Sequence, residues 1–180
     1  MEKRRNMVGS SEVSSFIMQQ ANTPLYVKIS KRKRNAMDKV MFSSNSNEWA
    51  TPQEFFDALD ARHHFTLDPC ATNENAKCKK FYTIAEDGLL QDWGGECVFC
   101  NPPYGRDIAK WVEKAYNETR KPNTKVVMLI PARTDTSYWH KWIFPHATHI
   151  DFVRGRIKFG NSKNSAPFPS AAVEFQNTDY

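Results

Sequence analysis

Three short apolar segments, each closed by a proline, constrain the fold of this chain more than any other feature. The segments and their closing residues are 65–67 with Asp68-Pro69, 98–100 with Asn101-Pro102-Pro103, and 126–130 with Pro131. Apolar runs of this length, bounded by turn residues, are typical of strands that are buried on both faces. Because helical patterns alternate with them, we expect an α/β fold with a mostly parallel sheet and helices on both faces.

The helical patterns have recognisable ends. Thr51-Pro52-Gln53-Glu54 predicts a helix start, with Thr51 as the N-cap, Pro52 in the first helical position and Glu54 completing a capping box. His63 and His64 are predicted to cap the other end of this helix. Apolar spacing predicts further helices over residues 108–120 and 139–144, and further strands over residues 150–153, 156–159 and 171–175.

Positive charge is concentrated near the amino terminus. Residues 1–45 contain nine Lys and Arg against three Asp and Glu, although the whole chain has a formal net charge of only +5. Because this segment has no sustained apolar period, we expect a basic N-terminal extension over residues 1–45 and a folded domain over residues 46–180. Such an extension favours a polyanionic partner, although a solvated surface run is the more common role of a sequence such as residues 31–34.

The composition is typical of a globular cytoplasmic protein. Its hydrophobic fraction is 40%, and no apolar run approaches the roughly 20 residues that are needed to cross a bilayer. Four cysteines do not predict a disulfide framework, and Cys97 and Cys100 would point to opposite faces of one strand. We therefore expect no metal site and a cytoplasmic location.

Asn101-Pro102-Pro103-Tyr104 is the motif most suited to chemistry, because it directly follows a predicted buried strand. Open α/β sheets bind ligands outside the carboxyl ends of their strands. Two consecutive prolines restrict the backbone and would keep a carbonyl group aimed in one direction. The alternative is a strand-to-helix turn without a functional role, since Asn-Pro is a common turn former.

This motif resembles the catalytic motif of amino-group methyltransferases, and the wider chain resembles the phage-type Dam family of DNA adenine N6-methyltransferases. The resemblance runs through segments 48–52, 67–71, 87–89, 93, 101–104, 129–131, 155–159 and 168–170. It implies a Rossmann-like methyltransferase fold, S-adenosylmethionine as cofactor and double-stranded DNA as partner. Protein glutamine methyltransferases share the four-residue motif, so a protein substrate stays an alternative. A non-catalytic DNA-binding module on the same fold is another.

For this chemistry, each residue of the motif has an expected catalytic role. The exocyclic amine of adenine is a poor nucleophile, because its lone pair is conjugated into the ring. Asn101 would accept one hydrogen of that amine through its side chain, and Pro102 would accept the other through its carbonyl group. Pro103 would hold the backbone in place, and Tyr104 would offer a flat face on which a flipped base can stack.

The resemblance also implies a set of cofactor-binding residues. Asp68 ends the first strand, where a carboxylate can accept from the ammonium group of the cofactor; an Asx turn or a helix cap is the alternative. Asp87 lies where the family places an acid near the adenine of the cofactor, and an ordinary turn is its alternative. A glycine-rich loop, common in methyltransferases after the first strand, is absent from residues 68–72. The full expected set is Thr51, Pro52, Asp68, Pro69, Asp87 and Asn101.

Four basic residues are candidates for contact with DNA. Arg133 follows the strand over residues 126–130 and is expected on the rim of the site. Alternation along an extended segment would place Arg154, Arg156 and Lys158 on one face, which suits contact with phosphates. Surface solubility is the alternative role for these side chains.

Overall fold

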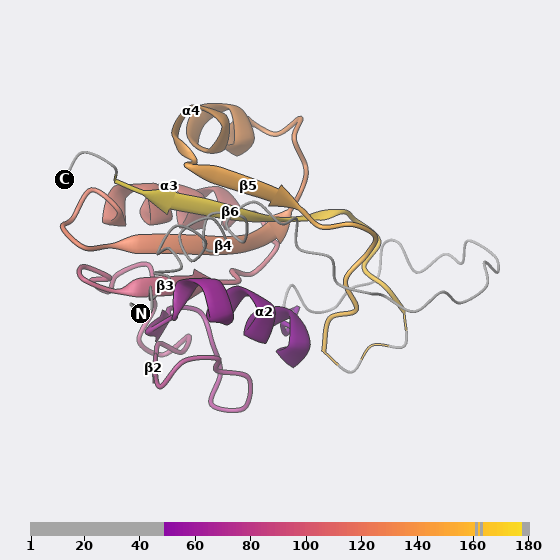
Figure 1. Cartoon of the computed structure of the whole chain (residues 1–180), viewed down its shortest axis with the longest axis horizontal. Helices are drawn as coiled ribbons and strands as arrows, with labels where there is room; N and C mark the ends of the chain where they lie inside the picture. Colours follow the sequence, from indigo (N-terminus) through magenta and orange to yellow (C-terminus); the bar gives the residue numbers. More distant parts are fainter. Residues whose placement is uncertain (1–48, 161, 163, 178–180) are drawn as a thin grey trace, which may run out of the picture.

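The computed structural model describes residues 49–160, 162 and 164–177 (Figure 1). The predicted basic extension over residues 1–45 therefore lies outside the described residues. Within the part of the chain that the structure describes, no helix is long and apolar enough to cross a membrane.

The centre of the fold is a six-stranded sheet with the order β2-β1-β3-β4-β6-β5 (Figure 1). Strands β1 to β4 pair in parallel, whereas β6 is antiparallel to both of its neighbours, β4 and β5. Five of the six strands thus run in one direction, which confirms the mostly parallel sheet. The strands are β1 (Leu67–Asp68), β2 (Lys80–Phe81), β3 (Cys97–Cys100), β4 (Lys125–Pro131), β5 (His149–Phe152) and β6 (Ser170–Gln176).

Helices cover both faces of this sheet. Phe56 of α2 (Gln53–His63) packs edge-on against Phe99, with ring centroids 5.1 Å apart. On α3 (Ile108–Glu118), Tyr116 lies 6.3 Å from Phe175. Phe99 is in register with Val127 and Glu174, one position away from Phe175, so the two aromatic side chains point to opposite faces. The π-helix η2 (Trp139–Ile143) continues into α4 (Phe144–His146) and buries Trp139, which confirms a helix in this region.

The start of α2 differs from the prediction. Pro52 occupies the N-cap position and no side chain caps the helix, so the placements of Thr51, Pro52 and Glu54 were each wrong by one residue. The hydroxyl oxygen of Thr51 instead accepts a hydrogen bond from Asn101, which a capping interaction would compete with. At the other end, His64 caps the helix in the left-handed conformation and donates its backbone N–H to Asp60.

The prediction of a strand over residues 156–159 is wrong, and strand β2 was not predicted. After β5 the chain turns at Gly155, whose φ is +86°, and residues 156–159 then run without a partner strand. Ile157 and Phe159 are nevertheless buried, so their alternation with polar residues reflects packing and not a place in the sheet. Strand β2 has only two residues, which is too short for any alternation to be visible in sequence.

Candidate active site

The sheet brings the loops after β1 and β3 together. These strands are neighbours. The chain leaves β1 toward β2 on one side and leaves β3 toward β4 on the other, which makes the place between β1 and β3 the switch point where open sheets bind ligands. A cavity of about 700 Å³ lies there. Its walls come from residues 49–51, 68–77, 83–89, 99–103 and 107–111. Among the predicted site residues, those on the walls are Thr51, Asp68, Pro69, Asp87, Asn101, Pro102 and Pro103.

Asn101 has its amide nitrogen fully engaged and its amide oxygen unengaged. Its Nδ2 donates to the carbonyl oxygen of Trp49 at 2.5 Å and to Oγ1 of Thr51 at 2.9 Å. Its Oδ1 is buried and has no hydrogen-bond partner among the described residues. Buried acceptors without a partner are costly, typically about 1–3 kcal/mol, and those that persist in folded proteins call for a reason. Here the oxygen belongs to a residue that lines the cavity, where a bound donor would satisfy it.

Asp68 contributes a buried carboxylate to the same cavity. Its side chain is 5% exposed, and burial raises its pKa to about 6, although hydrogen bonds from the backbone N–H groups of Lys77 and Cys70 oppose this shift. The contact with Cys70, two residues on, is the Asx turn that was the alternative role. The turn and a place on the cavity wall are therefore compatible.

Asp87 shows the same combination. Its Oδ1 accepts from the backbone N–H of Leu89 at 3.1 Å, as in an ordinary turn, and its φ of +51° is in the left-handed region. The residue also lines the cavity, on the wall formed by residues 83–89. Both roles considered from sequence thus stay available to this side chain.

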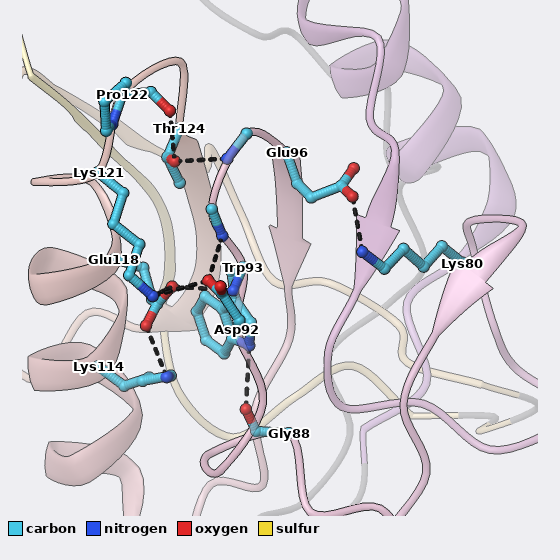
Figure 2. A network of polar contacts seen from close by, with 12 residues as sticks. Lys80, Gly88, Asp92, Trp93, Glu96, Lys114, Glu118, Lys121, Pro122 and Thr124 are labelled. Carbon is cyan, nitrogen blue, oxygen red and sulfur yellow. Dashed lines mark hydrogen bonds and ion pairs between the residues drawn. The ribbon is translucent and has the colours of Figure 1, made fainter.

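The wall that carries Asp87 is anchored to α3 through Trp93 (Figure 2). The indole N–H of Trp93 donates to the carbonyl oxygen of Gly88 at 3.0 Å, and its backbone N–H donates to Glu118 at 2.9 Å. Glu118 is 4% exposed and also accepts from Lys114 and Lys121, each at 2.6 Å. Burial would raise the pKa of Glu118, but these hydrogen bonds hold it below its ordinary value. The buried carboxylate is therefore charged and fully paired.

Tyr104, the last residue of the motif, lies in the core. It is 7% exposed, its hydroxyl donates to the carbonyl oxygen of Leu129, and burial raises its pKa well above the ordinary value. Its ring lies 6.5 Å from that of Trp49 at an interplanar angle of 20°, and it does not reach the cavity wall. Stacking of a base on Tyr104 stays a prediction that this arrangement does not test.

The four predicted DNA-contacting residues are exposed, and none of them is among the described residues that line the cavity. Arg133 packs its guanidinium group over the ring of Phe168, 5.8 Å from the centroid. Arg154, Arg156 and Lys158 follow β5, with the buried Ile157 between the last two. Arg156 and Lys158 therefore flank a buried position as predicted, but the exposed Gly155, with φ of +86°, turns the chain between Arg154 and Arg156, so the extended segment predicted to carry all three is interrupted.

Several wall residues were not predicted from sequence. Lys77, Ile84 and Trp111 carry no motif signal, because their place in the cavity depends on how distant segments pack. Trp49 lies in segment 48–52 of the resemblance, but no role was assigned to it. Cys70 also lines the cavity, with its Sγ 3.7 Å from Sγ of Cys100. The thiol of Cys97 instead donates to the carbonyl oxygen of His63. The two thiols of β3 thus have different partners, which confirms that Cys97 and Cys100 point to opposite faces of the strand.

Comparison with known proteins gives one matching family and several relatives. The family described as DNA N-6-adenine-methyltransferase (Dam) matches residues 39–173. A DNA N-6-adenine-methyltransferase of Haemophilus phage HP1 is 32% identical over 123 residues, which cover 67% of this chain and 70% of that protein. One of Escherichia phage T1 is 38% identical over 94 residues, 51% of this chain but only 38% of the phage protein. The putative methyltransferase YfdM of Escherichia coli is 32% identical over 65 residues, 32% of this chain and 71% of YfdM.

Proposed function

The chain belongs to the DNA N-6-adenine-methyltransferase (Dam) family, and from that premise we propose that it methylates the N6 amine of an adenine in DNA, with S-adenosylmethionine as donor. The observation that carries the proposal is the buried, unpartnered Oδ1 of Asn101, a residue that lines the cavity. An acceptor held in that state suits a substrate that presents N–H donors, as an exocyclic amine does.

The residues of the cavity suit S-adenosylmethionine in size and charge. A volume of about 700 Å³ is within the range of small-molecule sites. The buried carboxylate of Asp68 suits the ammonium group of the cofactor, and Asp87 would accept from its adenine amine. Pro69 lies on the same wall and completes the proposed binding set; Thr51 also lines the cavity, whereas Pro52 does not. We also assign the chain a Rossmann-like methyltransferase architecture, which the antiparallel β6 between β4 and β5 supports.

The proposed mechanism requires orientation more than acid–base strength. Bound S-adenosylmethionine supplies an electrophilic methyl group, so the residues need not form a covalent intermediate. Asn101 Oδ1 and the Pro102 carbonyl oxygen accept the two amine hydrogens of a flipped adenine, which frees the nitrogen lone pair from conjugation. Pro103 restricts the backbone so that these acceptors keep their positions, and this pre-organisation lowers the barrier. The surplus proton leaves to solvent after the new N–C bond has formed.

A direct assay separates this function from the alternatives. The purified chain is incubated with labelled S-adenosylmethionine and either double-stranded DNA or a mixture of proteins, and the products are analysed for N6-methyladenine and N5-methylglutamine. We expect label in adenine only. Label in protein would replace the proposal by glutamine methylation, and binding of DNA without any label would replace it by a non-catalytic module.

The raised pKa of Asp68 predicts that cofactor affinity depends on pH. An ammonium group binds the ionised carboxylate, and a group with a pKa of about 6 is mostly protonated at pH 5 and mostly ionised at pH 7. Affinity for S-adenosylmethionine measured by calorimetry should therefore be about tenfold weaker at pH 5 than at pH 7. Asp68→Asn should bind weakly at both pH values; a native protein with a flat profile would contradict the assignment.

The same pKa has the opposite effect on the protein without cofactor. Because the folded pKa lies above the ordinary value of 3.8, the folded state binds the proton more tightly than the unfolded state does. The stabilising contribution is fully present below pH 3.8 and is lost as pH rises through about 6. Unfolding by urea at several pH values, compared with Asp68→Asn, measures this dependence.

We propose that the basic extension over residues 1–45 and the cluster Arg133, Arg154, Arg156 and Lys158 contact phosphates of double-stranded DNA. Each cation that engages a phosphate contributes roughly −0.9 to the slope of log affinity against log salt concentration. Replacing all of Lys31, Arg32, Lys33 and Arg34 by Gln should flatten that slope and weaken binding at low salt. The rate at saturating DNA should barely change. An unchanged slope would assign this run to solvent or to another partner.

A further inference from the structure

We infer that the Trp49 carbonyl group and the Thr51 hydroxyl group lock the orientation of the Asn101 amide, which makes Thr51 a positioning residue for methyl transfer. The inference rests on the proposed function, in which Asn101 Oδ1 accepts a hydrogen of the target amine. It gives Thr51 a role that differs from the cofactor contact implied by the resemblance.

The hydrogen bonds determine how the Asn101 amide is oriented. A backbone carbonyl oxygen can only accept, so the atom of Asn101 that lies 2.5 Å from the Trp49 oxygen must be the nitrogen. The second hydrogen of that nitrogen points to Thr51 Oγ1 at 2.9 Å. Both donors are then used, and Oδ1 is left on the other side as the acceptor without a partner.

The two acceptors are themselves held in place by packing. Thr51 is 6% exposed, and the carbonyl oxygen of Ala50 accepts from the backbone N–H of Gly160 at 2.7 Å. The ring of Trp49 packs edge-on against Phe159 and Phe168, with centroids 5.5 and 5.2 Å apart. Residues 49–51, which precede α2, are thus held against residues that follow β5. They present two acceptors in fixed positions to Asn101, which directly follows β3.

Rotation of the amide by half a turn would reverse its chemistry. The nitrogen would then take the place of Oδ1 and present donors to an amine that also presents donors, which is repulsive. Its oxygen would face the Trp49 carbonyl oxygen, and the two acceptors would repel each other. A hydroxyl group can donate as well as accept, so the acceptor-only Trp49 carbonyl oxygen is the group that excludes the rotated amide, and Thr51 adds the second hydrogen bond that holds the nitrogen in place. Loss of that bond should lower the rate of methyl transfer and leave cofactor affinity in place.

A pair of matched substitutions tests this role in the full chain. Thr51→Val keeps the shape of the side chain and removes the acceptor, whereas Thr51→Ser keeps the hydroxyl group. We expect Thr51→Val to lower kcat about five- to tenfold with the Kd for S-adenosylmethionine within twofold of the native value. Thr51→Ser should recover most of that loss. Weaker cofactor binding with unchanged kcat, or an equal loss in both variants, would overturn the inference.

A second measurement needs neither a variant nor turnover. In protein labelled with nitrogen-15, hydrogen exchange of the Asn101 side-chain amide is compared with that of the exposed Asn117 on α3. Both Asn101 hydrogens should exchange at least tenfold more slowly than those of Asn117, because both are hydrogen-bonded. Equal exchange rates would overturn the lock. A native protein that methylates no DNA would refute the proposed function instead, while this measurement would still decide the orientation.

Discussion

Asn101→Ala is expected to lower the rate of methyl transfer to DNA by at least about 100-fold, the usual effect of removing one group that acts on the reacting atoms. The substitution removes the only buried, unpartnered side-chain oxygen among the described residues that line the cavity. Without it, the target amine keeps a single acceptor, the Pro102 carbonyl oxygen, and its lone pair stays conjugated. Single-turnover kinetics with saturating DNA and cofactor measure this step directly.

The affinity for S-adenosylmethionine should change by no more than about threefold in the same variant, because Asp68 and Asp87 provide the main polar contacts we propose. Asn117→Ala is the matched control: it makes the same chemical change on the exposed side of α3. Near-native turnover by Asn101→Ala would refute the mechanism. Loss of cofactor binding in that variant would indicate that Asn101 contacts the cofactor and not the target amine.

The part of the fold nearest the site was the easiest to predict, because its strands are buried on both faces. Val98 and Val126 have no exposed surface, and such positions produce the continuous apolar runs seen in the sequence. The prolines that close those runs mark the strand ends, so the placement of Asp68 and Asn101 at one edge of the sheet follows from the sequence alone.

The sequence did not predict the structure correctly where tertiary packing differs from what the local pattern indicates. Ile157 and Phe159 alternate with exposed residues as a strand would, yet no neighbouring strand is available after the turn at Gly155. Thr51 carries every local sign of an N-cap, but its hydroxyl is engaged by a residue 50 positions away. The presence of Lys77, Ile84 and Trp111 on the cavity wall depends on similarly distant contacts, which no motif records.

Gly88 shows how closely two walls of the cavity approach each other. A Cβ at this position would lie 1.9 Å from the carbonyl oxygen of Pro69 and 2.9 Å from its carbonyl carbon. Neither partner can yield without cost. Pro69 follows β1 directly, and the Gly88 carbonyl is held by Trp93, whose backbone is held by the buried Glu118 (Figure 2).

Gly88→Ala is therefore expected to lower the free energy of unfolding by about 2–3 kcal/mol and to weaken S-adenosylmethionine binding more than tenfold, since the loops carrying Asp68 and Asp87 must separate. Gly94→Ala is the control: the atoms nearest to its Cβ would be Asp92 Oδ1 and Lys121 Cδ, at 3.1 and 3.2 Å, which belong to flexible side chains. Urea unfolding and calorimetry on both variants provide the comparison. If Gly88→Ala matched Gly94→Ala in stability and in affinity, the close approach of these walls would have no bearing on the site.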